Sequence, residues 1–124
     1  MTALMRSTIG CLIPSIVACT IQKISYRMDI EPILNEKCIK CHAPPYGIGY
    51  KKTGLNMLSY DSLIDGTIYG PVIVAGDSKR SIINMLAEGR VDKLEQNNHG
   101  DGKALTSEEI QLLKLWVDQG ASNN

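Results

Sequence analysis

The sequence is poor in the large aromatic side chains that usually fill a protein core. It contains no phenylalanine, five tyrosines and one tryptophan in 124 residues. Hydrophobic residues still make up 44% of the chain, which is enough to support a core and argues against a disordered protein. Packing this chain with so few rings is expected to leave a gap unless another large apolar group fills it.

The chain also lacks an excess of charge of either sign. Lysine and arginine together number 13, and aspartate and glutamate number 13, so the formal net charge is zero. A protein that binds nucleic acid usually carries a clear positive excess, so we expect no nucleic-acid partner. No internal repeat and no low-complexity tract is visible, and the length corresponds to one domain.

No hydrophobic run is long enough to span a bilayer, which needs about 20 residues. The longest apolar stretch covers residues 8–19, follows a polar start with Arg6, and has the layout of a secretory signal with small residues before a cleavage site. It ends in Ile16-Val17-Ala18-Cys19, which resembles the lipobox of bacterial lipoproteins. In that family the chain is cut before the cysteine, and the cysteine carries lipid.

The lipobox resemblance implies a division of the chain into three parts. Residues 1–18 are a lipoprotein-type signal peptide, residues 19–28 a tether that begins at the lipidated Cys19, and residues 29–124 the folded domain. The protein then lies on the periplasmic side of a bacterial membrane, associated with it through the lipid anchor. A plain signal peptide and an uncleaved anchor are the alternatives.

The rest of the chain predicts an all-α domain of about four helices and long loops. The helical spacing of Ile30, Ile33 and Leu34 predicts a helix over residues 29–38, with Asp29 as its cap and Pro32 in its first turn. Residues 46–52 are expected to form a loop. The apolar, glycine-bounded segment 70–77 is expected to be an extended buried loop rather than a strand.

Three further helices are predicted from capping and stop signals. One covers residues 60–65 between Ser59 and Gly66, and one runs from a cap at Asp77 or Ser78 to Glu88. In the last helix, Thr106 and Glu109 form a capping box, and Gly120 ends it. The residues expected to face inward from these last two helices are Ile82, Ile83, Met85, Leu86, Ile110, Leu113, Trp116 and Val117.

The motif Cys38-Ile39-Lys40-Cys41-His42 follows the first predicted helix. CxxCH is the pattern of covalent c-type haem attachment. Two thiols three residues apart can add to the two vinyl groups at one edge of a porphyrin, and the adjacent His42 then reaches the iron from one side. The sequence therefore predicts one covalent haem c on Cys38 and Cys41, with His42 as an axial ligand.

Three other interpretations of the two cysteines were weighed. A thioredoxin-type redox pair would accompany a βαβ pattern, which is absent. A zinc site would have to combine Cys38, Cys41 and His42 with His99, in no standard spacing. A structural disulfide between Cys38 and Cys41 leaves His42 unexplained.

A longer set of segments resembles the planctomycete-type cytochrome c domain, a branch of the single-haem class I cytochromes c. The resemblance covers about residues 30–121: the first helix with CIKCH, then Gly70-Pro71-Val72-Ile73-Val74-Ala75-Gly76-Asp77, and finally Leu105 to Ile110 and Leu113 to Ala121. It implies a class I cytochrome c fold around one haem, with the first and last helices crossing beside it. Ile33 or Leu34 would then meet Trp116 at the crossing.

The resemblance also bears on the sixth iron ligand. The family usually places a methionine shortly before the last helix, but this sequence has Asn97 at that position. His99 is the only histidine besides His42 and lies in the same segment, so we expect His99 as the sixth ligand. Met85 is the second candidate and could instead serve as core filler. Met57 is the third and could instead pack over the haem edge.

The expected function is one-electron transfer by a membrane-tethered cytochrome with a redox protein as partner, rather than enzymatic catalysis. One alternative is a five-coordinate haem protein that binds a small ligand, as a sensor or peroxidase-like protein does. Another is a haem docking module of a larger respiratory complex.

Overall fold

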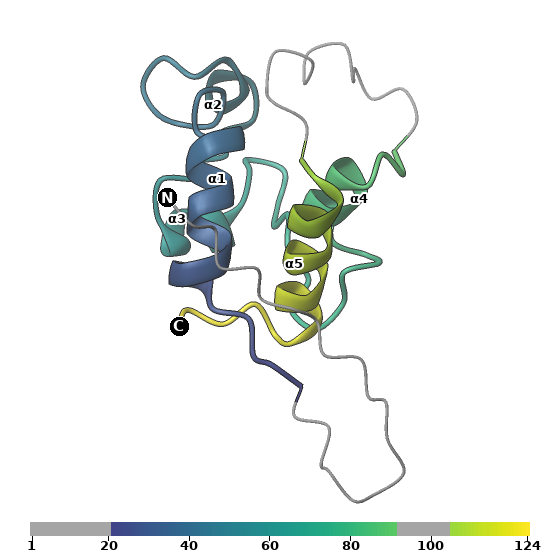
Figure 1. The fold of residues 1–124 in the computed structure, drawn as a ribbon. Coiled ribbons are helices and arrows are strands. Elements are labelled where there is room, and N and C mark those ends of the chain that lie inside the picture. The colour runs from purple at the N-terminus through teal and green to yellow at the C-terminus, as the bar shows by residue number, and fades with distance from the viewer. Residues whose placement is uncertain (1–20, 92–104) are drawn as a thin grey trace, which may run out of the picture.

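A computed structural model describes residues 21–91 and 105–124, in which short helices are joined by loops and turns (Figure 1). The described residues form five α-helices and no strand, apart from an isolated bridge between Thr67 and Gly70. An all-α fold is therefore confirmed. The elements are a π-helical turn η1 (Tyr26–Ile30), α1 (Glu31–Lys37), α2 (Ile48–Thr53), α3 (Tyr60–Asp65), α4 (Ile82–Ala87) and α5 (Ser107–Asp118).

The first helical segment begins three residues earlier than predicted, and its cap is a different residue. The Ser25 side chain accepts a hydrogen bond from the backbone N–H of Met28 and caps η1. The Asp29 carboxylate accepts from the Ser25 N–H at 2.8 Å, so Asp29 supports this cap from inside the helix instead of being the cap. Pro32 lies in the first turn of α1 as predicted, where its missing N–H costs no hydrogen bond.

The folded domain consequently includes the end of the segment predicted to be a tether. Ile24 and Tyr26 are buried, and both belong to the main hydrophobic cluster. Ile24 is the first buried residue of the described chain and lies five residues before the predicted start of the domain at residue 29. The signal peptide, Cys19 and the rest of residues 1–20 lie outside the described residues.

Helix α2 occupies the segment that was predicted to be a loop. None of its residues is buried, so it has no apolar periodicity by which the sequence could reveal it. Its stability comes from contacts with the preceding turn: the Tyr50 N–H donates to the Cys41 carbonyl at 2.9 Å. The helix ends at Gly54, whose φ of +76° is a left-handed conformation that glycine adopts without strain.

Helix α3 matches its prediction, whereas α4 begins later than expected. Ser59 caps α3 in a capping box with Ser62, and Gly66 follows the last helical residue. In α4 the N-cap is Ser81 rather than Asp77 or Ser78. The Ser81 hydroxyl donates to the carbonyls of Val74 and Asp77 and so fixes the turn before the helix.

The inward face of α4 is narrower than predicted. Ile83 is buried, but Ile82 is 46% exposed, and Met85 and Leu86 are only half-buried. The other buried residue of the helix is the polar Asn84. The segment 70–77 is an extended loop as predicted, and it buries Val72 and Ile73.

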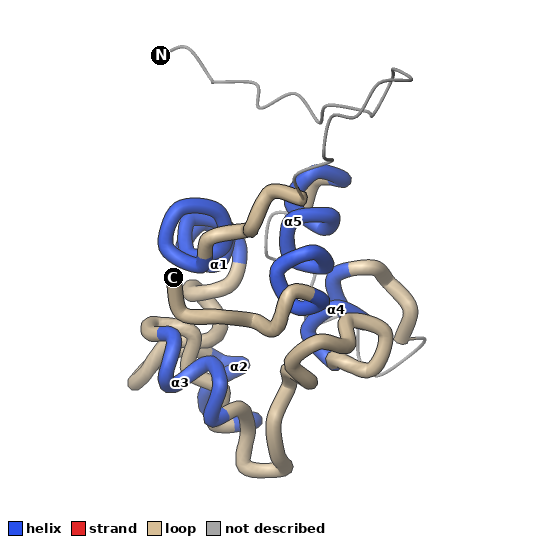
Figure 2. Tube along the Cα trace, turned by 90° about the horizontal axis from the view of Figure 1, so that it is seen from below, coloured by secondary structure: helices blue, strands red, loops and turns tan. Residues whose placement is uncertain are grey.

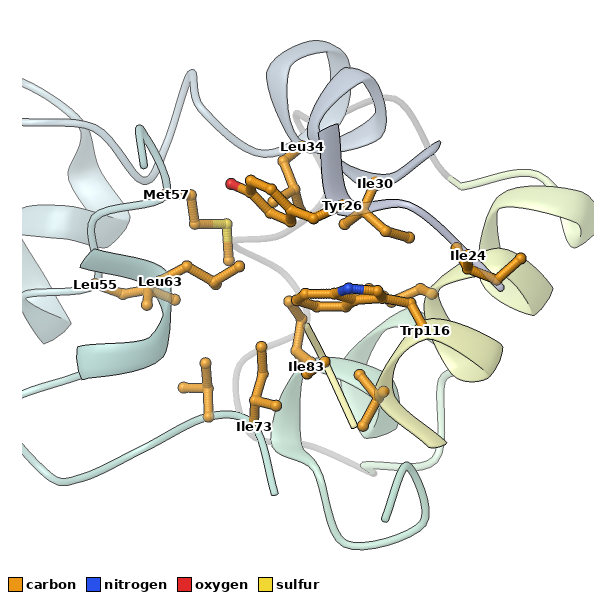
Figure 3. Close-up of a cluster of buried hydrophobic side chains, with 14 residues drawn as sticks. Ile24, Tyr26, Ile30, Leu34, Leu55, Met57, Leu63, Ile73, Ile83 and Trp116 are labelled. Atoms are coloured by element: carbon orange, nitrogen blue, oxygen red, sulfur yellow. The ribbon is translucent and has the colours of Figure 1, made fainter. Parts of the chain in front are cut away.

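Helix α5 has the predicted capping box, with Thr106 and Glu109 bonding reciprocally. Its residues Leu113, Trp116 and Val117 are buried, while Ile110 is half-buried. The Trp116 ring lies 5.5 Å from Tyr26 and 6.4 Å from Tyr60, between ring centroids, and joins η1 and α3 to α5. The cluster comprises Ile24, Tyr26, Ile30, Leu34, Leu55, Met57, Leu63, Val72, Ile73, Ile83, Leu113, Trp116, Val117 and Ala121 (Figure 3).

The first and last helical segments run antiparallel. Lys37 at the end of α1 pairs with Glu109 at the start of α5, with 3.7 Å between nitrogen and oxygen, and η1 packs against α5. Leu34 shares the buried cluster with Trp116, whereas Ile33 is buried outside it. Helix α4 packs against the same last helix (Figure 2). The hydrophobic cluster therefore combines residues from both ends of the described chain.

The capping box of α5 generates a stability prediction. We expect Thr106→Ala to lower the free energy of unfolding by about 1 kcal/mol, because the N–H of Glu109 loses its acceptor. Urea unfolding of the purified protein measures this loss. Ser107→Ala is the matched control, because Ser107 is exposed and lies one residue further on. Equal effects of the two substitutions would contradict the role of the box.

Candidate functional site

The predicted site residues Cys38, Cys41 and His42 lie in one turn at the end of α1. Cys38 caps the helix, and its N–H donates to the Leu34 carbonyl at 2.9 Å. The Cys38 carbonyl then accepts from the N–H groups of both Cys41 and His42, at 3.1 and 3.0 Å. The helix thus continues into a tight turn that presents two thiols and an imidazole in sequence.

Both cysteines are free thiols, and burial disfavours the thiolate form of Cys38. They are half-buried, and Cys38 packs against the hydrophobic cluster. Burial raises the pKa of the Cys38 thiol to about 11, with smaller contributions from Cys41 and Glu109. Reactive cysteines of redox pairs and metal-bound cysteines depend instead on a lowered pKa. A thioether carries no charge, so it suits this apolar surrounding better than a thiolate does.

The imidazole of His42 is held by its closeness to Gly49 in α2. A Cβ atom on Gly49 would lie 2.5 Å from Cε1 and 2.8 Å from Nδ1 of His42, closer than real Cβ contacts allow. The Nδ1 atom is buried. Only glycine at position 49 lets the ring and the α2 backbone approach this closely, and the approach restricts the orientation of the ring.

Two backbone hydrogen bonds also hold the turn. The N–H of Met57 donates to the His42 carbonyl at 2.8 Å, and the N–H of Tyr50 donates to the Cys41 carbonyl. The sequence did not lead us to Gly49, and it suggested for Tyr50 only a side-chain contact with the haem, not this backbone bond. Glycines at positions 47 and 49, so soon after the motif, were the available signal of a close backbone approach.

An apolar surrounding adjoins this turn. Figure 3 shows Met57, Leu63, Ile73, Ile83 and Trp116 gathered in the hydrophobic cluster. All five side chains are buried, and they come from segments far apart in the sequence. The shallow open pocket of about 280 Å³ that Tyr26, Tyr60 and Asn123 help to line is a different feature and includes none of the predicted site residues.

The residues present therefore fit a covalently attached haem c. Cys38 and Cys41 would hold it through thioethers, His42 would bind its iron, and the buried cluster would cover its apolar faces. Within residues 21–91 and 105–124, no three His, Cys, Asp or Glu side chains converge where they could hold a metal ion. His99, which the zinc alternative requires, is not among these residues.

The candidates for the sixth ligand are placed only in part. His99 and the neighbouring Asn97 lie outside the described residues. Met85 is half-buried on α4, and Met57 is buried in the cluster with its backbone bonded to His42. The sixth ligand therefore stays a prediction.

Comparison of the chain with protein-family models, curated proteins and solved structures finds no match. Among the described helices, none combines the length and the hydropathy that crossing a membrane requires.

The Gly49 contact generates a prediction for the site. We expect Gly49→Ala to lower the free energy of unfolding by roughly 1–3 kcal/mol, because the added methyl group collides with the imidazole. Denaturant unfolding of the purified protein measures the effect. Ile48→Ala is the control, since Ile48 precedes Gly49 on α2 and is 54% exposed. A Gly49→Ala protein as stable as the Ile48→Ala protein would refute the close approach.

Proposed function

We propose that this protein is a class I c-type cytochrome that carries single electrons on the periplasmic side of a bacterial membrane. One haem c is attached to Cys38 and Cys41, with His42 as an axial ligand, and a lipid on Cys19 anchors the mature chain. The observation that carries the proposal is the turn at the end of α1. It presents two free thiols and an oriented imidazole beside a buried apolar cluster.

The chemistry divides between the haem and the chain. The haem supplies an iron that changes its charge by one electron. Cys38 and Cys41 attach the group permanently, and the contact with Gly49 keeps the His42 ring in one orientation. The buried side chains exclude water, which keeps the surrounding dielectric low and influences the reduction potential.

The arrangement of helices supports the class I fold. The first helical segment, which leads into CIKCH, packs against the last one, and Leu34 and Trp116 belong to the same cluster. This pairing agrees with the resemblance to the planctomycete-type domain. The shortage of aromatic residues agrees as well, because a porphyrin supplies the large ring that the sequence lacks.

Covalent attachment of the haem is the first thing to test. We expect the protein, expressed in a host with intact cytochrome maturation, to keep its haem after acidic acetone extraction and denaturing electrophoresis. Cys38→Ala/Cys41→Ala should lose all covalent haem, because no thioether forms. Mass spectrometry and haem absorbance measure both proteins. Cys11→Ala is the control and should retain the haem; an intact wild-type chain without an added haem mass would refute the proposal.

The axial ligands are tested by low-temperature electron paramagnetic resonance of the oxidised protein. We expect a low-spin signal of two histidine ligands that disappears in His99→Ala. Met85→Ala is the matched control and should leave the signal unchanged. An unaltered signal in His99→Ala would remove His99 as a ligand, and a change in Met85→Ala alone would assign the site to Met85. A high-spin signal in the wild type would favour the alternative of a five-coordinate, ligand-binding haem.

A further inference from the structure

Gln119 fastens the beginning of the packed chain to the end of α5. The Ile24 N–H donates to the Gln119 Oε1 atom at 2.8 Å, and the Gln119 Nε2 atom donates to the Gln22 carbonyl at 3.0 Å. The side-chain amide thus satisfies one donor and one acceptor of the same extended segment. It does so immediately before Ile24 enters the core.

Asn124 repeats this arrangement a few residues further on. The Tyr26 N–H donates to Asn124 Oδ1 at 2.9 Å, and Asn124 Nδ2 donates to the Ile24 carbonyl at 3.2 Å. The Asn124 carbonyl accepts from the Arg27 N–H and from the Ser25 hydroxyl, at 3.1 and 2.7 Å. We call residues 22–27 together with Gln119 and Asn124 the terminal clamp. It prevents residues 22–27 from behaving as a flexible linker.

The terminal clamp and the CIKCH turn lie at opposite ends of the molecule. Figure 1 shows the start of the described chain and the C-terminus at one end, and α2 at the other. The two ends are joined by the helical segment from Tyr26 to the cap residue Cys38, which is about 18 Å long at 1.5 Å per residue. Two apolar side chains are exposed near the clamp: Ile21 at 84% and Met28 at 72%.

The covalent chain then limits how far the clamp end can lie from a lipid on Cys19. Ile21 is two residues after Cys19, and two fully extended residues span at most about 7 Å. Ile24, the first buried residue, is five residues after Cys19 and therefore at most about 18 Å from it. A connection this short does not allow the domain to rotate until its opposite end faces the membrane.

We propose that the clamp end of the domain lies on the surface of the lipid bilayer, with Ile21 and Met28 in contact with the interfacial region. The CIKCH turn and α2 then point away from the membrane, toward the aqueous phase. This inference rests on the lipid attachment at Cys19 that belongs to the proposed function. It goes beyond that function by fixing which face meets the lipid.

The orientation has a consequence for charge. The segment from Lys37 to Tyr60 contains four lysines and no aspartate or glutamate, and of these Lys40, Lys51 and Lys52 are exposed. Attraction to anionic lipid alone would draw this positive end to the membrane. The terminal clamp and the short connection to Cys19 oppose that attraction. The covalent constraint and the electrostatic attraction therefore predict opposite orientations, which an experiment can distinguish.

The experiment measures thiol accessibility on lipidated, haem-containing protein made from the full chain. Met28→Cys and Lys52→Cys each introduce a single reactive thiol, because the thioethers occupy Cys38 and Cys41 and the lipid occupies Cys19. Each variant is inserted into preformed vesicles of phosphatidylethanolamine and phosphatidylglycerol and treated with a bulky, membrane-impermeant maleimide. Its unlipidated counterpart, exported behind an ordinary signal peptide and carrying Cys19→Ser so that no second thiol is free, is treated in the same way.

We expect the vesicle-bound Met28→Cys protein to react several-fold more slowly than its unlipidated counterpart, and Lys52→Cys to react equally in both forms. A flexible glycine–serine insertion between Thr20 and Ile21 should restore the reactivity of Met28→Cys, because it removes the limit set by chain length. Equal reactivity of Met28→Cys in the two forms, or protection of Lys52→Cys, would overturn the proposed orientation.

Two measurements distinguish this failure from failure of the proposed function. The mass of the mature N-terminus shows whether Cys19 carries lipid, and a chain without lipid overturns the orientation too. If the protein carries no haem, haem absorbance is absent and the maleimide labels Cys38 and Cys41 of the wild-type protein.

Discussion

The contact between the His42 imidazole and Gly49 is the constraint on which the rest of the site depends. It requires a helix, α2, to pass within van der Waals distance of a ring that the preceding turn presents. The Cys41 and His42 carbonyls accept hydrogen bonds from Tyr50 and Met57, so the same contact positions the turn and the chain that follows it. Through Met57 the turn is continuous with the buried cluster.

The two ends of the described chain complete that cluster. Ile24, Tyr26 and Leu34 come from its beginning, and Trp116, Val117 and Ala121 come from its end. The side-chain amides of Gln119 and Asn124 bond the backbone of residues 22–27 and hold these parts together. Because the core combines both ends, removing either end exposes apolar surface on the other, and the domain is expected to fold as one cooperative unit.

The sequence predicted those elements whose signals are local. Helix α3 lies between Ser59 and Gly66, and α5 begins with the Thr106–Glu109 box, so capping chemistry alone located both. Helix α2 could not be found in this way, since its hydrogen bonds and contacts reach back to Cys41 and His42 and none of its side chains is buried. Asp29 was taken for a cap because aspartate often is one. Its carboxylate instead turns back to Ser25.

The predictions for the site divide in the same way. The spacing of Cys38, Cys41 and His42 and its position at a helix end followed from the motif, and the structure places all three in one turn. The raised pKa of Cys38 could not be predicted, because it arises mainly from burial, which depends on packing between distant segments. Ile82 was expected to face inward, but it is the first residue of α4 and is 46% exposed.

The single tryptophan gives the molecule an intrinsic optical probe. Trp116 is buried, its indole N–H donates to the Ser122 carbonyl, and its ring contacts two of the five tyrosines. Excitation energy absorbed by Tyr26 or Tyr60 can pass to the indole over these short separations, and a porphyrin beside the cluster would accept it in turn. Tryptophan fluorescence would then be quenched in the native state and would appear on unfolding. Its intensity would report whether the core is intact without any added dye.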